Sequence, residues 1–242
     1  MRLSLIVPAH NEERYLPRLL ASVERARRAY ASGSDAVETI VADNGSTDRT
    51  AEIAAARGCL VVRVEKRAIA AARNGGAAAA RGEILCFTDA DGLVHPRTFE
   101  VIDTAMASGR FVAGATGVTM ERWSPGIAAT FVLALPLLWV TGFDTGVVFC
   151  RRDDFEAVGG YDESRRYAED VALLLALRRL GERDGRKLAR LRGVKAVAST
   201  RKFDEHGDWH YFTRMPPLAW RMLFRKSEMT DFAERYWYAS RR

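Results

Sequence analysis

The sequence is poor in cysteine and histidine, with three and four residues of these types in a chain of 242. Cys59, Cys86 and Cys150 are widely separated and form no Cys-x-x-Cys pair, so we expect neither a zinc site nor a disulfide framework. The chain also lacks the pattern GxxxxGK[ST], which excludes a P-loop enzyme. No signal peptide precedes the first apolar stretch, and we therefore expect a cytoplasmic protein with reduced, buried thiols.

Long hydrophobic runs are absent as well. The apolar stretch 127–140 is interrupted by Thr130 and Pro136 and is shorter than the roughly 18 to 20 residues of a spanning helix. We expect a buried helix or one that lies on a membrane surface. The net charge of +6 suits nucleotide phosphates, acidic lipid headgroups or nucleic acid, but no recognised nucleic-acid module is present, so nucleic acid is not an expected partner.

The pattern of apolar residues predicts an α/β fold. The chain is 48% hydrophobic and 28% charged, which is typical of a globular domain. Strand-like runs alternate with helical spacing through residue 92, and this alternation indicates a Rossmann-like, mostly parallel mixed sheet with helices on both faces. The expected strands in this half are 2–8, 39–42, 60–64 and 84–87, followed in the second half by 111–119, 145–150 and 194–198.

Two adjacent glycines interrupt the helix expected over 68–81. Gly75 and Gly76 would each cost about 1 kcal/mol relative to alanine inside a helix. Close approach of another backbone or of a ligand would justify them, and the alternative is a kink in the helix.

Acidic residues follow three of the expected strands. Glu12 and Glu13 come after the first, Asp43 ends the second, and Asp89 and Asp91 follow the fourth. Because the carboxyl ends of parallel strands meet at one edge, where ligands bind in open α/β sheets, we expect these loops to converge. Paired carboxylates bind a hard cation such as Mg²⁺ together with substrate phosphates. Ordinary turns are the alternative for each loop alone.

Five motifs occur in an order that resembles a known family. They are VPAHNEE (7–13), VADNGSTD (41–48), ARNGG (72–76), TDAD (88–91) and AED (168–170). Each is weak alone, but together they are specific. The chain resembles the family 2 glycosyltransferases, inverting enzymes with the GT-A fold, over roughly residues 3–205.

The resemblance implies a site for a nucleotide-sugar donor, with a UDP-sugar favoured. Arg73 would lie near the nucleotide or its phosphates. Asp89 and Asp91 match the DXD motif, which holds the diphosphate through Mg²⁺ or Mn²⁺, with Asp91 as the metal ligand. Four residues would line the nucleobase and ribose pocket: Pro8, Ala9, Glu12 and Asp43.

The resemblance also implies a catalytic base. Asp170 matches the second residue of the family's ED motif, and a carboxylate with an ordinary pKa of about 3.9 is ionised at neutral pH and can accept a proton from a hydroxyl. An acid placed at a helix N-terminus for its dipole is the alternative, and the role of Glu169 stays open. Gly146 and residues 159–162 would build the acceptor side.

A basic element late in the chain would close over the diphosphate. It covers residues 199–202, and Arg201 would contact the donor. We expect His206 as a further metal ligand, with His210 as the alternative. Both histidines also suit a surface or packing role.

These features predict an inverting, metal-dependent glycosyltransferase acting on a sugar, lipid or small-molecule hydroxyl. We expect a GT-A domain over 1–207, with a nucleotide-binding half (1–92) and an acceptor half (93–207), and a helical extension over 208–242. A sugar-nucleotide nucleotidyltransferase and a non-catalytic nucleotide-sugar-binding module are the alternatives. A homodimer and a peripheral contact with the inner face of the membrane stay open.

Overall fold

The computed structural model describes residues 1–132, 146–165, 168–210 and 212. The chain divides into two compact units. Unit 1 comprises Met1–Thr119 and Asp144–Ala198, and unit 2 comprises Met120–Phe143 and Ser199–Arg242.

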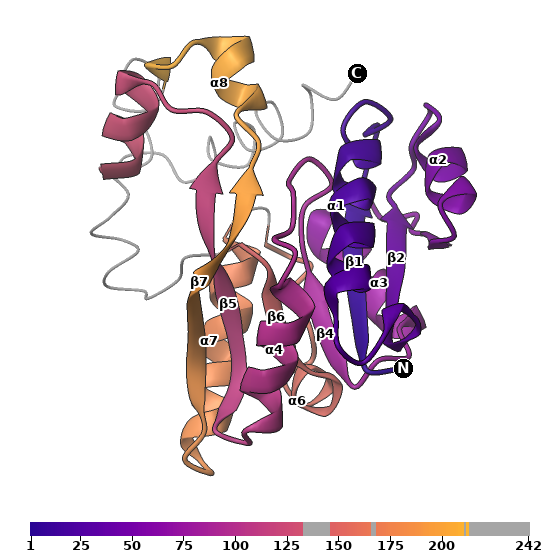
Figure 1. Cartoon of the computed structure of the whole chain (residues 1–242), viewed down its shortest axis with the longest axis vertical. Coiled ribbons are helices and arrows are strands. Elements are labelled where there is room, and N and C mark those ends of the chain that lie inside the picture. The colour runs from indigo at the N-terminus through magenta and orange to yellow at the C-terminus, as the bar shows by residue number, and fades with distance from the viewer. Residues whose placement is uncertain (133–145, 166–167, 211, 213–242) are drawn as a thin grey trace. The chain divides into compact units, whose positions relative to one another are not determined.

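Unit 1 is built on a seven-stranded sheet in the order β3-β2-β1-β4-β6-β5-β7 (Figure 1). Strand β1 is parallel to β2 and β4, and β2 is parallel to β3. Strand β6 runs antiparallel to β4 and β5. The mostly parallel mixed sheet confirms the predicted fold class. The strands are β1 (Leu3–Ala9), β2 (Val37–Asp43), β3 (Leu60–Arg63), β4 (Ile84–Phe87), β5 (Phe111–Met120), β6 (Val148–Arg151) and β7 (Lys187–Ala198).

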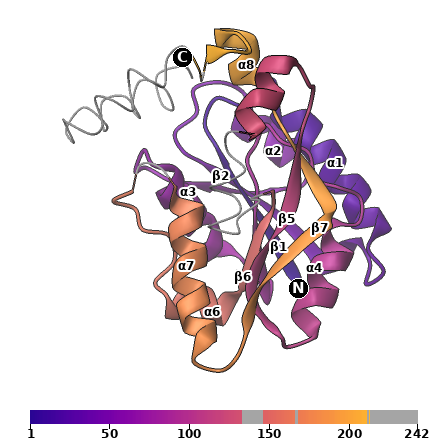
Figure 2. The ribbon, with the colours of Figure 1, turned by 90° about the vertical axis from the view of Figure 1, so that its left-hand side faces the viewer.

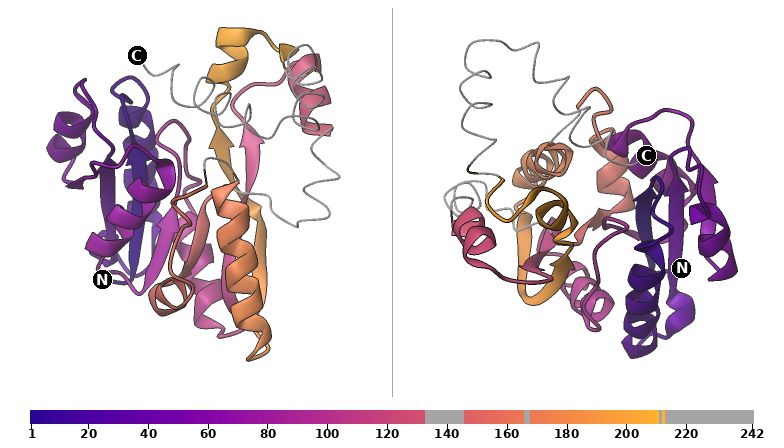
Figure 3. Two further views of the ribbon diagram at one scale, coloured as in Figure 1. Left: turned by 180° about the vertical axis from the view of Figure 1, so that it is seen from behind. Right: turned by 90° about the horizontal axis from the view of Figure 1, so that it is seen from above.

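Helices cover both faces of this sheet. Helices α1 and α4 lie on one face, as Figures 1 and 2 show, and the view from behind in Figure 3 shows α3, α6 and α7 on the other. The core between these layers is apolar because the strands β1, β2, β4 and β6 bury their Leu, Ile, Val or Phe side chains, whereas β3 at the edge of the sheet stays partly exposed. The helices of unit 1 are α1 (Leu16–Ala29), α2 (Thr50–Ala56), α3 (Ile69–Ala79), α4 (Thr98–Ala107), α6 (Arg152–Ala157) and α7 (Glu169–Glu182), with a short 3₁₀ turn, η1 (Ser34–Ala36).

The paired glycines lie in an unbroken α3 and allow it to pack closely on the sheet. A Cβ atom on Gly76 would lie 2.5 Å from Cγ2 of Ile6, and one on Gly75 would lie 2.6 Å from Cγ2 of Val64. Close approach, rather than a kink, therefore explains both glycines.

Strand β7 is longer than the sequence predicts. It begins at Lys187 rather than at residue 194. The added residues include Lys187, Arg190 and Arg192, whose charges mask a strand pattern. They are tolerated because β7 is the last strand in the sheet order, and an edge strand can carry charged side chains that face water.

Unit 2 contains α8 (Arg201–His206) and a helical stretch over 125–132. The apolar stretch expected over 127–140 is thus helical through 132, and its remainder lies outside the described residues. Most of the extension predicted over 208–242 also lies outside them, so the boundary after residue 207 stays a prediction. None of the described helices has both the length and the apolar character needed to cross a bilayer.

Candidate active site

The loops that follow β1 and β2 are joined by hydrogen bonds at the carboxyl edge of the sheet. The amide of Thr47 donates to Oδ1 of Asn11 at 2.8 Å, and the Asn11 amide donates to Oγ of Ser46 at 3.1 Å. The Glu12 amide donates to Oγ1 of Thr50 at 2.8 Å. Asn11 adopts φ 54, a left-handed conformation that asparagine tolerates better than most residues. The two loops therefore form one polar rim.

The structure brings the four residues predicted for the nucleotide pocket to this rim. Ala9 and Asp43 are register partners at the ends of β1 and β2, and Pro8 precedes Ala9 in the same strand. Glu12 and Asp43 are buried, and Oδ1 of Asp43 accepts a hydrogen bond from the Ser46 amide at 3.0 Å. Their contact with a nucleotide stays a prediction.

Arg73, on α3, is the centre of a buried ionic cluster, and its side chain is only 4% exposed. Its Nη1 donates to Oδ1 of Asp170 at 2.8 Å and to Oε1 of Glu169 at 3.2 Å. Its Nη2 donates to Oδ1 of Asp89 at 3.0 Å. A buried guanidinium requires such partners because its desolvation is costly. We call Arg73, Asp89, Tyr161, Glu169 and Asp170 the Arg73 cluster.

Tyr161 completes the cluster from the segment between α6 and α7. Its hydroxyl donates to Oδ1 of Asp170 at 2.8 Å, and Cζ of Arg73 lies 5.1 Å from the centre of its ring. This is cation–π geometry. Asn74 clamps the Tyr161 backbone, since Nδ2 of Asn74 donates to the Tyr161 carbonyl and the Tyr161 amide donates to Oδ1 of Asn74, both at 2.9 Å.

The cluster carries more negative than positive charge, because three carboxylates share one guanidinium. Burial alone would lower the pKa of Arg73, but Asp170 and the other carboxylates raise it well above its ordinary value. Burial also raises the pKa of Glu169, against the opposing effect of Arg73. Nε of Arg73 is buried and has no hydrogen-bond partner in the part of the chain that the structure describes. The cluster therefore carries a net negative charge, and one N–H group of its only cation is not used by the described residues.

Helix α7 places two of these carboxylates. Glu169 and Asp170 form its first turn, where the helix dipole favours acidic side chains. The N-cap residue, Ala168, has φ 55, an uncommon conformation for a residue with a Cβ atom, and one that costs free energy. The turn directs both carboxylates to Arg73, and the Asp170 side chain is still 23% exposed.

Asp89 and Asp91 lie in the turn that follows β4, as predicted. The Asp89 side chain is 68% exposed, and Asp91 is partly buried. Two nearby carboxylates fit Mg²⁺ or Mn²⁺, since such ions are commonly held by one or two protein carboxylates together with substrate phosphates. In the described residues, no group of three or more His, Cys, Asp or Glu side chains is arranged to hold a metal.

Arg201 and His206 lie in α8 of unit 2. The rings of His206 and His210 are 5.7 Å apart, in an edge-on arrangement, and His210 is buried. The roles predicted for Arg201 as a donor contact and for His206 as a metal ligand stay predictions.

The sequence did not indicate the position of Tyr161. The resemblance places residues 159–162 on the acceptor side, which stays a prediction. The structure buries Tyr161 of this segment against Asp170, and the residue is only 2% exposed. The only local signal is an aromatic residue after two glycines, eight positions before Glu169. Nothing in that spacing reveals the contact with Arg73.

The chain matches a known protein family. The model described as "Glycosyl transferase family 2" matches residues 4–131, which is more than half of the chain. The chain belongs to glycosyl transferase family 2. It is 34% identical over 116 residues to the dolichyl-phosphate beta-glucosyltransferase of Drosophila melanogaster, which corresponds to 44% of this chain and 36% of that protein. The chain spans between 15% and 36% of the length of the curated relatives that it matches.

Solved structures agree on the fold. Residues 1–349 of TarS from S. aureus, crystallised with UDP-GlcNAc, match with a TM-score of 0.64 and 19% identity over 83% of this chain and 59% of that one. The mannosyltransferase PcManGT from Pyrobaculum calidifontis, in complex with GDP-Man and Mn²⁺, matches with a TM-score of 0.62 and 21% identity over 81% and 56%. These likenesses confirm the predicted GT-A fold of this glycosyltransferase.

Proposed function

We propose that this family 2 member is an inverting, metal-dependent enzyme that moves a sugar from a nucleoside diphosphate donor to an acceptor hydroxyl, with Asp170 as the general base. The observation that carries the proposal is the convergence of Asp89, Glu169 and Asp170 on the buried Arg73, beyond the carboxyl end of β4. The nucleotide sugars bound to TarS and PcManGT support the donor class. A UDP-sugar is the favoured donor.

Asp170 supplies the base. Its carboxylate takes the proton of the acceptor hydroxyl as the hydroxyl oxygen attacks the anomeric carbon. The new glycosidic bond forms as the bond to the diphosphate breaks on the opposite face, and the electron pair leaves with the diphosphate. A single displacement of this kind inverts the anomeric centre and needs no covalent intermediate with the protein.

Asp91, with Asp89, would hold Mg²⁺ or Mn²⁺ against the diphosphate. The ion, when bound, neutralises negative charge on the leaving group. Arg73 holds Asp89 by one carboxylate oxygen, which fixes the start of the turn that carries Asp91. Arg201 and His206 are proposed to add a donor contact and a further ligand.

Family membership favours glycosyl transfer over the nucleotidyl transfer that the sequence left open. The remaining alternative is a module that binds nucleotide sugars without turnover. The enzyme and the binding module differ once the donor is bound, because only an enzyme forms product when an acceptor is added.

A ligand screen combined with product analysis tests the proposal. We expect UDP-sugars to raise the melting temperature in the presence of Mn²⁺, because a ligand that binds only the folded state stabilises it by about 2.7 kcal/mol at 100 times its Kd. D91N should lose the part of the melting-temperature increase that depends on Mn²⁺. D153N changes an exposed residue in the first turn of α6 and should keep the full increase. Equal shifts in D91N and wild type, or a product of retained anomeric configuration, would contradict the proposal.

We also propose a cytoplasmic location with peripheral contact between unit 2 and a membrane. All five tryptophans fall within unit 2 of the sequence, and Trp123 and Trp209 are 52% and 51% exposed. Tryptophan prefers the membrane interface. Tryptophan fluorescence therefore reports on unit 2 alone, and anionic vesicles should shift its emission to the blue. An unchanged spectrum would oppose the contact.

A further inference from the structure

The two oxygens of Asp170 have different surroundings. Oδ1 accepts hydrogen bonds from Nη1 of Arg73 and from the hydroxyl of Tyr161, both at 2.8 Å. Oδ2 accepts none among the residues that the structure describes. The donors come from separate parts of the chain, since Arg73 belongs to α3 and Tyr161 precedes α7. One oxygen is thus held from two sides, and the other stays available.

We propose that Tyr161 is a positioning residue, which together with Arg73 fixes Oδ1 of Asp170 and leaves Oδ2 to take the proton of the acceptor hydroxyl. This inference rests on the proposed function, in which Asp170 is the base. Tyr161 itself is only 2% exposed, so it acts through Asp170 and does not contact the acceptor.

Arg73 alone does not determine where Asp170 points. Its two Nη atoms also bond Glu169 and Asp89, so a movement of either carboxylate would move the guanidinium. The Tyr161 hydroxyl bonds only Asp170 among the side chains in the cluster. It therefore provides a second anchor that does not depend on the other two carboxylates.

The ring of Tyr161 is itself held firmly. It packs edge-on against Phe87, with ring centres 5.1 Å apart, and against Phe155 at 5.9 Å. Burial and the nearby Asp170 raise the pKa of Tyr161 well above its ordinary value, so the hydroxyl keeps its proton and remains a donor at neutral pH. A rigid neutral donor suits a positioning role, because a misplacement of about 1 Å in a reacting group can cost roughly 100-fold in rate.

The test compares Y161F with Y30F. Tyr30 is also buried, lies in unit 1, and donates its hydroxyl to Oδ2 of Asp103 at 2.6 Å, so Y30F removes the same kind of bond away from the cluster. We expect Y161F to lower kcat by about 10- to 100-fold with an unchanged KM for the donor, and Y30F to leave both unchanged. Each substitution keeps its ring, and thermal unfolding of the two variants checks that they fold.

A double variant separates positioning from a general structural role. If Tyr161 acts through Asp170, then D170N/Y161F should have the kcat of D170N, because the two effects are not independent. The inference is overturned if Y161F turns over like wild type, or if it lowers kcat by the same factor in the D170N background. Wild-type turnover in D170N would instead sink the proposed base, so the two failures are distinguishable.

Discussion

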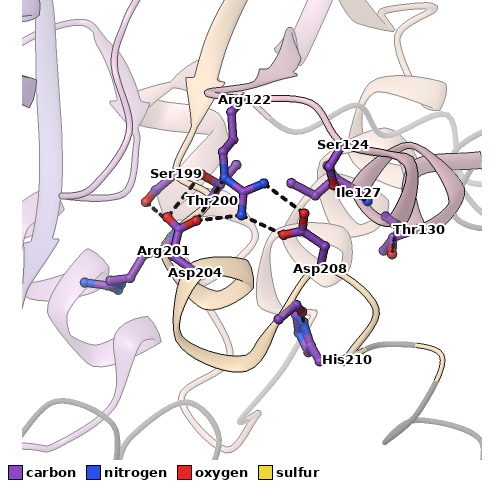
Figure 4. Close-up of polar contacts among 12 residues, drawn as sticks. Arg122, Ser124, Ile127, Thr130, Ser199, Thr200, Arg201, Asp204, Asp208 and His210 are labelled. Carbon is purple, nitrogen blue, oxygen red and sulfur yellow. Dashed lines mark hydrogen bonds and ion pairs between the residues drawn. The ribbon is translucent and has the colours of Figure 1, made fainter.

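Two clusters, in each of which one arginine bonds carboxylates far from it in the sequence, differ in burial. The Arg73 cluster lies in unit 1, and the Arg73 side chain is 4% exposed. The second, which we call the Arg122 cluster, consists of Arg122, Asp204 and Asp208 in unit 2 (Figure 4). Nη2 of Arg122 donates to Oδ1 of both aspartates at 2.6 Å, and its side chain is 39% exposed.

The same chemical groups behave differently because their burial and charge balance differ. In the Arg122 cluster, hydrogen bonds from Arg122 and from Ser124 lower the pKa of Asp208 to about 2. In the Arg73 cluster, burial raises the pKa of Glu169, and the neighbouring Asp170 adds to the shift. The exposed cluster stabilises its charges, whereas the buried one keeps the Glu169 carboxylate in an unfavourable environment. Functional sites often retain such a cost.

The largest expected difference is in turnover. D170N removes the proposed base and should lower kcat by about 10²- to 10⁴-fold, the range typical of general acid–base catalysis. D208N makes the same change in the Arg122 cluster and should leave kcat unaltered. Steady-state kinetics at saturating donor measure both, and calorimetric titration checks that D170N still binds the donor. Lost donor affinity in D170N with unchanged kcat would contradict its assignment as the base.

The next difference is in stability. R73Q leaves three carboxylates without their cation and should cost about 3–5 kcal/mol of unfolding free energy, as expected for one partner of a buried ion pair. R122Q should cost far less, because exposed ion pairs contribute little.

Urea unfolding at pH 7 can assign each loss to a unit. All tryptophans belong to unit 2, so tryptophan fluorescence follows that unit, and far-UV circular dichroism follows the whole chain. R73Q should shift mainly the dichroism transition. Equal losses of unfolding free energy in R73Q and R122Q would contradict the expected difference between the two clusters.

Acid should affect the two clusters with opposite sign. The pKa of Asp208 falls from its ordinary 3.8 to about 2 in the folded state. Its contribution to the unfolding free energy is therefore complete above pH 3.8 and is lost as the pH falls towards 2. The folded-state pKa of Glu169 lies above its ordinary 4.5, so its ionised form destabilises the fold at neutral pH and protonation relieves this as pH falls.

Two isosteric variants measure these signs. E169Q should be more stable than wild type at pH 7, and the difference should shrink towards pH 4. D208N should be less stable than wild type at pH 6, and that difference should disappear near pH 2. Unfolding free energies measured from pH 2 to 7 show the direction of each effect. A destabilised E169Q at neutral pH would show that the bond of Glu169 to Arg73 stabilises the fold by more than the burial of the carboxylate destabilises it.

The smallest expected difference is in response to salt. The Debye length falls from about 10 Å at 0.1 M to about 3 Å at 1 M salt, and exposed pairs are screened far more than buried ones. The stability difference between R122Q and wild type should therefore shrink in 1 M NaCl, while that of R73Q persists. Unfolding in both salt concentrations measures this, and a salt-sensitive R73Q would mean that the ion pairs of Arg73 are screened like those of an exposed arginine.

Much of the fold could be predicted because it depends on local patterns. Alternating strand and helix periods indicated the α/β class, and β4 lies where predicted, at Ile84–Phe87. Parallel pairing then placed Asp43 and the turn after β4 at one edge of the sheet. The prediction of β7 was too short because charged residues on an edge strand conceal its period.

Residues close together in the chain were enough to predict the family, the order of the elements and the acidic turns at the strand ends. Which side chains meet depends on packing between segments that are distant in the chain. Arg73 reaches Asp170 across 97 positions, on a helix whose approach to the sheet depends on Gly75 and Gly76. The Tyr161 hydroxyl reaches the same carboxylate because α6, α3 and β4 pack around its ring, and no local spacing encodes such a contact.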